Sequence, residues 1–97
     1  MGKRIVYRLT SERAAGRLGM MFDFVFVDGD HTYSGCNLDI TLFWPKVHQG
    51  GVMIFHDYTH KRNESGKFGV KRAVDELGER ESLEVLVDGE CAAIYKP

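Results

Sequence analysis

Two clusters of acidic and imidazole side chains each follow an apolar run of the sequence. Their five members are Asp28, Asp30, His31, His56 and Asp57. The runs before them, 22–27 and 52–55, are rich in β-branched and aromatic residues, which is typical of strands buried in a parallel sheet. Because ligands bind beyond the carboxyl ends of such strands, two neighbouring strands would bring the five groups to one rim.

Two kinds of chemistry suit these residue types. Carboxylates at two strand ends beside an imidazole favour a hard divalent cation such as magnesium, with Asp28, Asp57 and His56 as ligands. An imidazole or carboxylate at a strand tip can also take a proton from a hydroxyl, which makes His31, His56 and Asp28 candidate catalytic residues. The structural alternative is that strand-end aspartates cap the next turn by accepting from backbone N–H groups. Spacing alone leaves these interpretations open.

Strands and helices alternate along the chain. The predicted strands span residues 4–9, 22–27, 52–55, 83–87 and 91–95. The predicted helices span residues 12–18, 32–48 and 70–77. Gly50-Gly51 is interpreted as the exit of the second helix and Gly78 as the stop of the third, while Pro45 predicts a kink or an early end. The alternation predicts an α/β fold in one domain, 1–97, and Asp88-Gly89 predicts a final hairpin.

Composition narrows the class of protein. Thirteen basic and fourteen acidic residues give a net charge of −1, which offers no electrostatic footprint for nucleic acid or an anionic membrane. Cys36 and Cys91 form no CxxC pair, so we expect reduced thiols. No apolar run approaches the ~20 residues of a membrane span, and no signal peptide is expected. These features predict a cytoplasmic protein.

Four stretches together resemble class I S-adenosylmethionine-dependent methyltransferases. They are Phe-Asp-Phe-Val-Phe-Val-Asp-Gly-Asp-His-Thr-Tyr at 22–33, Trp44-Pro45, Gly-Gly-Val-Met-Ile-Phe-His-Asp-Tyr at 50–58 and Gly-Val-Lys-Arg-Ala-Val-Asp-Glu-Leu at 69–77. The likeness is to the small-molecule and sugar O-methyltransferase branch with the Asp-Gly-Asp-His signature. It implies a Rossmann-like sheet, mostly parallel, with a C-terminal antiparallel hairpin.

The resemblance also implies a cofactor and a metal. S-adenosylmethionine would contact Ser11, Asp28 and Gly29, and magnesium would be held by Asp28 and the His56-Asp57 pair. That pair departs from the Asp-Asp or Asp-Asn of relatives with a clear metal site. The family's Gly-rich turn and second-strand acid are not found in these 97 residues, so the match begins at the family's third strand and we expect a partial, truncated domain.

A truncated sheet would leave the strand 22–27 with a bare apolar edge. Either the N-terminal strand folds onto this edge or a second copy pairs with it, and we expect a homo-oligomer, most simply a homodimer. The Lys61, Arg62 and Lys67 loop is either solvated or engages an anionic substrate.

Three functions remain open from the sequence. The first is methyl transfer to a small-molecule hydroxyl, by a chain that lacks the family's N-terminal cofactor-binding half. The second is a non-catalytic, oligomeric half-domain that binds a ligand. The third is a metal-dependent hydrolase that uses the same acids and imidazoles to activate water.

Overall fold

The computed structural model describes residues 4–6 and 22–97. The predicted helix over 12–18, the end of the first predicted strand and Ser11 lie outside these residues. The remaining predictions can be compared with the structure element by element.

The described strands form one five-stranded sheet. They are β1 (Arg4–Val6), β2 (Phe22–Val27), β3 (Val47–Phe55), β4 (Leu86–Asp88) and β5 (Cys91–Tyr95). Their order is β1-β2-β3-β5-β4, with β1, β2 and β3 parallel and β5 antiparallel to both of its neighbours. This arrangement confirms the predicted α/β class, the mostly parallel sheet and the C-terminal antiparallel hairpin.

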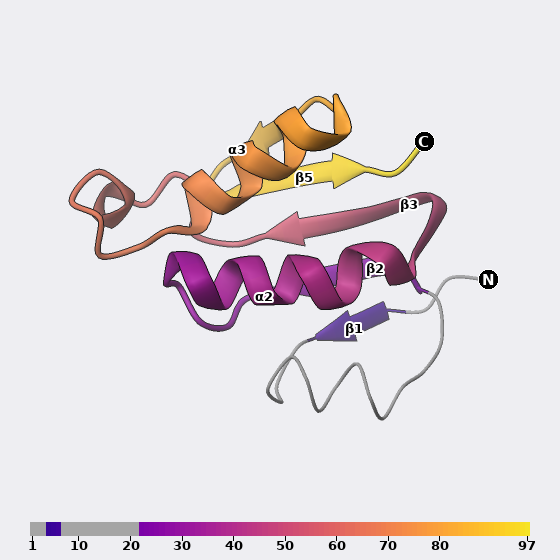
Figure 1. Cartoon of the computed structure of the whole chain (residues 1–97), viewed down its shortest axis with the longest axis horizontal. Helices are drawn as coiled ribbons and strands as arrows, with labels where there is room; N and C mark the ends of the chain where they lie inside the picture. The colour runs from indigo at the N-terminus through magenta and orange to yellow at the C-terminus, as the bar shows by residue number, and fades with distance from the viewer. Residues whose placement is uncertain (1–3, 7–21) are drawn as a thin grey trace.

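Both described α-helices, α2 (Tyr33–Phe43) and α3 (Val70–Glu81), lie on the same face of the sheet (Figure 1). The core forms between them and the strands, because alternate strand residues such as Val25, Met53 and Ile94 point toward the helices and are fully buried. Neither helix is long and apolar enough to cross a membrane.

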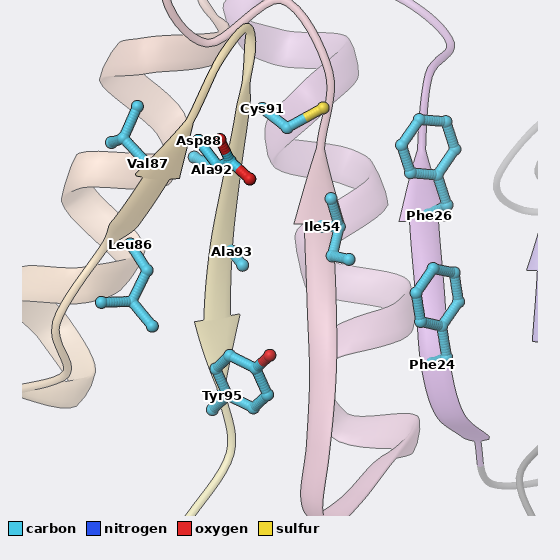
Figure 2. Close-up of a pocket in the computed structure, with 10 residues that line it drawn as sticks. All are labelled: Phe24, Phe26, Ile54, Leu86, Val87, Asp88, Cys91, Ala92, Ala93 and Tyr95. Atoms are coloured by element: carbon cyan, nitrogen blue, oxygen red, sulfur yellow. The ribbon is translucent and has the colours of Figure 1, made fainter.

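The opposite face of the sheet is also apolar. It carries a trough of about 650 Å³, and Figure 2 shows the side chains of Phe24, Phe26, Ile54 and Ala93 on the side away from the helices. Leu86 on β4, 43% exposed, lines the same trough.

Helix α2 ends earlier than predicted. Thr32 caps its start by accepting from the Gly35 N–H, but the helix stops at Phe43 and not near His48. The 3₁₀-helix η1 (Trp44–Lys46) follows and contains Pro45, whose ring cannot continue an α-helix. The predicted helix end near His48 is therefore wrong, whereas the alternative of an early end at Pro45 is confirmed.

Two glycines predicted to end that helix lie inside β3. Gly50 has a φ of +84°, and the register between β2 and β3 shifts between Phe22 and Phe24. A Cβ on Gly51 would come within 2.9 Å of the Asp23 carbonyl, so only glycine lets the strands approach here. The prediction of a helix exit is therefore wrong, and the glycines form an irregularity within a longer strand.

Gly78 does not stop α3. The helix continues to Glu81 and ends at Ser82, which takes the left-handed conformation with a φ of +57°. A Cβ on Gly78 would lie 2.9 Å from Cγ2 of Val85 and 3.1 Å from the Leu83 carbonyl. Gly78 therefore permits the chain after α3 to pass close to the helix.

The edge of the Phe22–Val27 strand, expected to be bare unless another strand covers it, is paired in the structure. β1 pairs in parallel with β2, from Arg4 opposite Phe24 to Val6 opposite Phe26. The N-terminal strand therefore covers this edge, which is one of the two alternatives that the sequence left open. Self-association stays a prediction, because the structure contains one chain.

One carboxylate of α2 is buried against the sheet. Asp39 is 2% exposed, and its Oδ2 has no hydrogen-bond partner. Burial, with a smaller contribution from the negative charge of Asp30, raises the pKa of Asp39 to about 7. The neutral form is favoured because a charged carboxylate without a partner is costly inside a protein.

We expect Asp39 to make the fold less stable as the pH rises. An unfolded aspartate has a pKa of about 3.9, so between pH ~4 and ~7 the folded state binds more protons, and stability falls by about 4 kcal/mol across this window. Asp39→Asn removes the ionisation and should keep ~3 kcal/mol that the parent chain loses between pH 5 and 8. Urea unfolding at both pH values measures this difference. Asp88→Asn, at an exposed site, is the control, and an equal pH dependence in the Asp39→Asn chain would contradict the prediction.

Candidate active site at the strand ends

The register of β2 and β3 brings two of the predicted site residues together. Val27 lies opposite Phe55, and the His56 N–H donates to the Val27 carbonyl at 3.1 Å, which extends the pairing by one step. Asp28 and His56 are therefore neighbours, with 3.5 Å between Asp28 Oδ1 and His56 Nδ1. The ring of His56 lies 6.4 Å from that of Phe26, on the side of the sheet away from the helices.

Asp57 joins the two clusters predicted from the sequence. Its φ is +65°, in the left-handed region that aspartate tolerates better than most residues, so its side chain leaves the strand alternation. Oδ1 lies 3.1 Å from His56 Nδ1, and Oδ2 lies 2.6 Å from His31 Nε2. The residue is only 9% exposed, so these contacts are shielded from water.

The acids control the charge of His56. Burial alone would lower its pKa, but the close contact with Asp57 and the negative charges of Asp57, Asp28 and Glu90 raise the pKa overall. The imidazolium form is thus favoured between two carboxylates when no other cation is present.

Asp28, His56 and Asp57 fit a divalent cation. One ligand atom from each lies within 4.8 Å of the others, and they form the one such group found among the described residues. His56 Nδ1 is buried without a well-aligned hydrogen bond, as expected of a donor atom aimed at a site between the carboxylates. Two carboxylates and an imidazole are a reasonable donor set for magnesium or manganese.

Asp30 does not join the rim. Its Oδ1 accepts from the Thr32 N–H at 2.9 Å and from the Thr32 hydroxyl at 2.8 Å. These bonds lower the pKa of Asp30, the backbone bond most strongly, and they build the turn that starts α2. For this residue the structural alternative holds, and the rim contains four of the five predicted groups.

His31 is held on two sides. Its ring stacks on Phe68 with 4.4 Å between ring centroids and 9° between planes, and its carbonyl accepts from the Gly69 N–H at 2.7 Å. Its Nε2 faces Asp57 as described above, yet its side chain remains 37% exposed. The imidazole is therefore fixed in orientation and still open to a ligand.

The segment between β3 and α3, residues 59–69, is tied to the strand end and is here called the rim loop. It contains the 3₁₀-helix η2 (Lys61–Asn63), which His60 caps by accepting from the Arg62 N–H. The His60 ring also packs on Phe68, with 4.7 Å between ring centroids, and is half-buried.

Asn63 is the main link between the rim loop and β3. Its side-chain amide donates to the carbonyls of Asp57, Tyr58 and His60 at 2.8–3.1 Å, and its Oδ1 accepts from the Lys71 N–H. Sequence reasoning missed both Asn63 and Phe68. Neither has a local signal, because their partners are defined only once β2, β3 and the rim loop are placed in space.

Three comparisons with known proteins agree with this arrangement. A family model described as a methyltransferase domain matches residues 4–58, more than half of the chain. An uncharacterized protein of Acanthamoeba polyphaga mimivirus is 40% identical over 40 residues, which cover 41% of this chain and 18% of the viral protein.

Solved structures give the same fold. The O-methyltransferase NovP has a TM-score of 0.63 at 24% identity, over 78% of this chain and 30% of NovP. MycE, a methyltransferase of mycinamycin biosynthesis solved with magnesium and SAH, has a TM-score of 0.60 at 22% identity, over 89% of this chain and 28% of MycE. The calicheamicin methyltransferase CalS11 has a TM-score of 0.62 at 11% identity, over 89% of this chain and 33% of CalS11. The chain thus spans about a third of these relatives, and on the family match it belongs to the methyltransferase-domain family.

Proposed function

We propose that this chain forms the acceptor side of an S-adenosylmethionine-dependent O-methyltransferase site, which methylates a hydroxyl of a small molecule. The observation that carries the proposal is the contact of one buried carboxylate, Asp57, with both His31 and His56 at the strand ends. Membership of the methyltransferase-domain family and the fold shared with O-methyltransferases support it.

His31 is the proposed general base. Its Nε2 lies 2.6 Å from the Asp57 carboxylate, and Nδ1 is the ring atom proposed to take the proton. S-adenosylmethionine supplies the methyl group on its sulfonium. His31 would take the hydroxyl proton of the acceptor at Nδ1, so that the acceptor oxygen could accept this methyl group.

Asp28, Asp57 and His56 would hold a divalent cation such as magnesium. When bound there, the cation would supply positive charge that favours the deprotonated hydroxyl of the acceptor. His56 is then a ligand, and its predicted second role as a base passes to His31. Asp57 would serve both residues, since its two oxygens face different imidazoles.

Few residues of this chain are proposed to contact the methyl donor. Asp28 and Gly29 at the end of β2 are the described residues proposed to face S-adenosylmethionine, and Ser11 lies outside the described part. No GxGxxG pattern occurs in the 97 residues, so these contacts would be made without a Gly-rich turn.

The proposed cation site should bind manganese through its two carboxylates. We expect Asp28→Asn and Asp57→Asn each to weaken Mn²⁺ binding at least tenfold, measured by electron paramagnetic resonance of the free ion. Asparagine tolerates the left-handed backbone of residue 57, so the fold should survive that change. Asp30→Asn is the matched control, because it removes a neighbouring charge outside the ligand set. An equal loss in all three variants would argue against a specific site.

Phe68 should position His31. Phe68→Ala removes the stacked ring, so the His31 imidazole proton resonances should move downfield as the ring current is lost, and methyl transfer should slow. Because Phe68 is half-buried, the free energy of unfolding should fall by only about 2 kcal/mol, less than for a fully buried ring. Phe68→Tyr keeps the stacked ring and should leave the resonances in place. Unchanged His31 resonances in Phe68→Ala would contradict the role of Phe68 in positioning His31.

Calorimetry of the 97-residue chain with S-adenosylmethionine, with and without magnesium, tests the proposed function directly. Weak but saturable binding at millimolar S-adenosylmethionine, strengthened by magnesium, is the expected result, because few residues of the chain face the methyl donor. His31→Gln should retain this binding, because His31 acts on the acceptor. No heat of binding at millimolar S-adenosylmethionine would rule out the proposed function for the isolated chain.

A further inference from the structure

We propose that the rim loop binds a phosphate or diphosphate group carried by the methyl acceptor. This assignment of the acceptor rests on the proposed function, whereas the anion site itself rests on the charges of the loop. Lys61, Arg62 and Lys67 are exposed on the loop and line a single shallow hollow with Glu64 and Ser65.

The loop cations differ from their neighbours in lacking acidic partners. On the adjacent helix, Lys71 pairs with Asp75 at 2.8 Å and Arg72 with Glu76 at 3.3 Å. Within the described residues, no carboxylate lies within ion-pair distance of the three loop cations, which face one acid, Glu64, across the hollow. The hollow therefore carries an excess of positive charge that an anionic ligand would neutralise.

The Phe68 ring lies between the hollow and the proposed base. The guanidinium of Arg62 lies 5.8 Å from the centre of the Phe68 ring, and the same ring stacks on His31. A molecule anchored by an anion in the hollow would have to extend past the Phe68 ring to reach the imidazole that takes the hydroxyl proton. This proximity links the charge of the hollow to the acceptor.

The backbone of the loop is fixed before a ligand binds. Asn63 holds it to β3 through three carbonyls, and the Ser65 hydroxyl donates to the Arg62 carbonyl at 3.1 Å. A charged loop that is only solvated would not require these hydrogen bonds to hold its backbone in place. Because the loop is preorganised, binding would cost mainly the ordering of the lysine and arginine side chains.

Phosphate chemistry matches this set of donors. Arginine presents a planar fork that bonds two phosphate oxygens, and lysine adds a compact positive charge. A sugar phosphate or nucleotide-linked sugar would combine such a group with hydroxyls of the kind that the proposed reaction methylates. A neutral acceptor would leave the loop cations unused.

Inorganic pyrophosphate is a suitable probe for the hollow. Titration is followed by amide resonances of residues 59–69, with EDTA present so that binding through a cation at Asp28 and Asp57 is excluded. We expect saturable shifts in these resonances, and at least tenfold weaker binding when Lys61→Gln and Lys67→Gln are combined. This double variant leaves Arg62 over Phe68.

The charge-matched control combines Lys46→Gln and Arg80→Gln, at the opposite ends of β3 and α3 from the rim loop, and should bind pyrophosphate within twofold of the parent chain. No saturable shift, or the same weakening in both double variants, would overturn the anion site. The titration contains no methyl donor, so it decides the anion site separately from the calorimetry that tests the proposed function.

Discussion

The parallel register of β2 and β3 is the constraint on which the site depends. Because Val27 lies opposite Phe55, the next residues of each strand, Asp28 and His56, must meet at the same end of the sheet. The irregularity at Gly50-Gly51 precedes Val52, and the pairing from Val52 to Phe55 is regular, so the C-terminal ends of the two strands stay in register. A slip of one residue would turn the buried strand side chains and both site residues to the wrong face.

Asp57 converts that alignment into a site. A regular strand residue would point along the alternation, whereas the left-handed backbone turns the carboxylate between two imidazoles. Burying an ionised carboxylate is costly unless it is paired, and His31 and His56 lie close enough to pair with Asp57. The same contacts set the charge state of His56 and the orientation of His31. One residue therefore links the electrostatics of the rim to its geometry.

Local signals in the sequence predicted a large part of the fold. Buried apolar runs predicted β2 and the end of β3, helical spacing predicted α3, and Asp88-Gly89 predicted the hairpin. The errors arose where glycine had a tertiary role, as at Gly51 inside β3 and at Gly78 inside α3. The convergence of the rim was predicted because strand ends meet in parallel sheets. The capping role of Asp30 and the contacts of Asn63 and Phe68 were not, since they depend on the exact path of the chain in space.

The three carbonyls held by Asn63 have a consequence for the motions of the molecule. Asp57, Tyr58 and His60 lose a shared donor together when this side chain moves, so the strand end and the rim loop cannot open independently. Slow hydrogen exchange would then be lost over both segments in a single event, as in a cooperative unit of local unfolding. Any motion that separates the rim loop from the strand end would also free the backbone of Asp57, whose carboxylate contacts His31 and His56. Movement of the rim loop and the placement of the Asp57 side chain are thereby coupled.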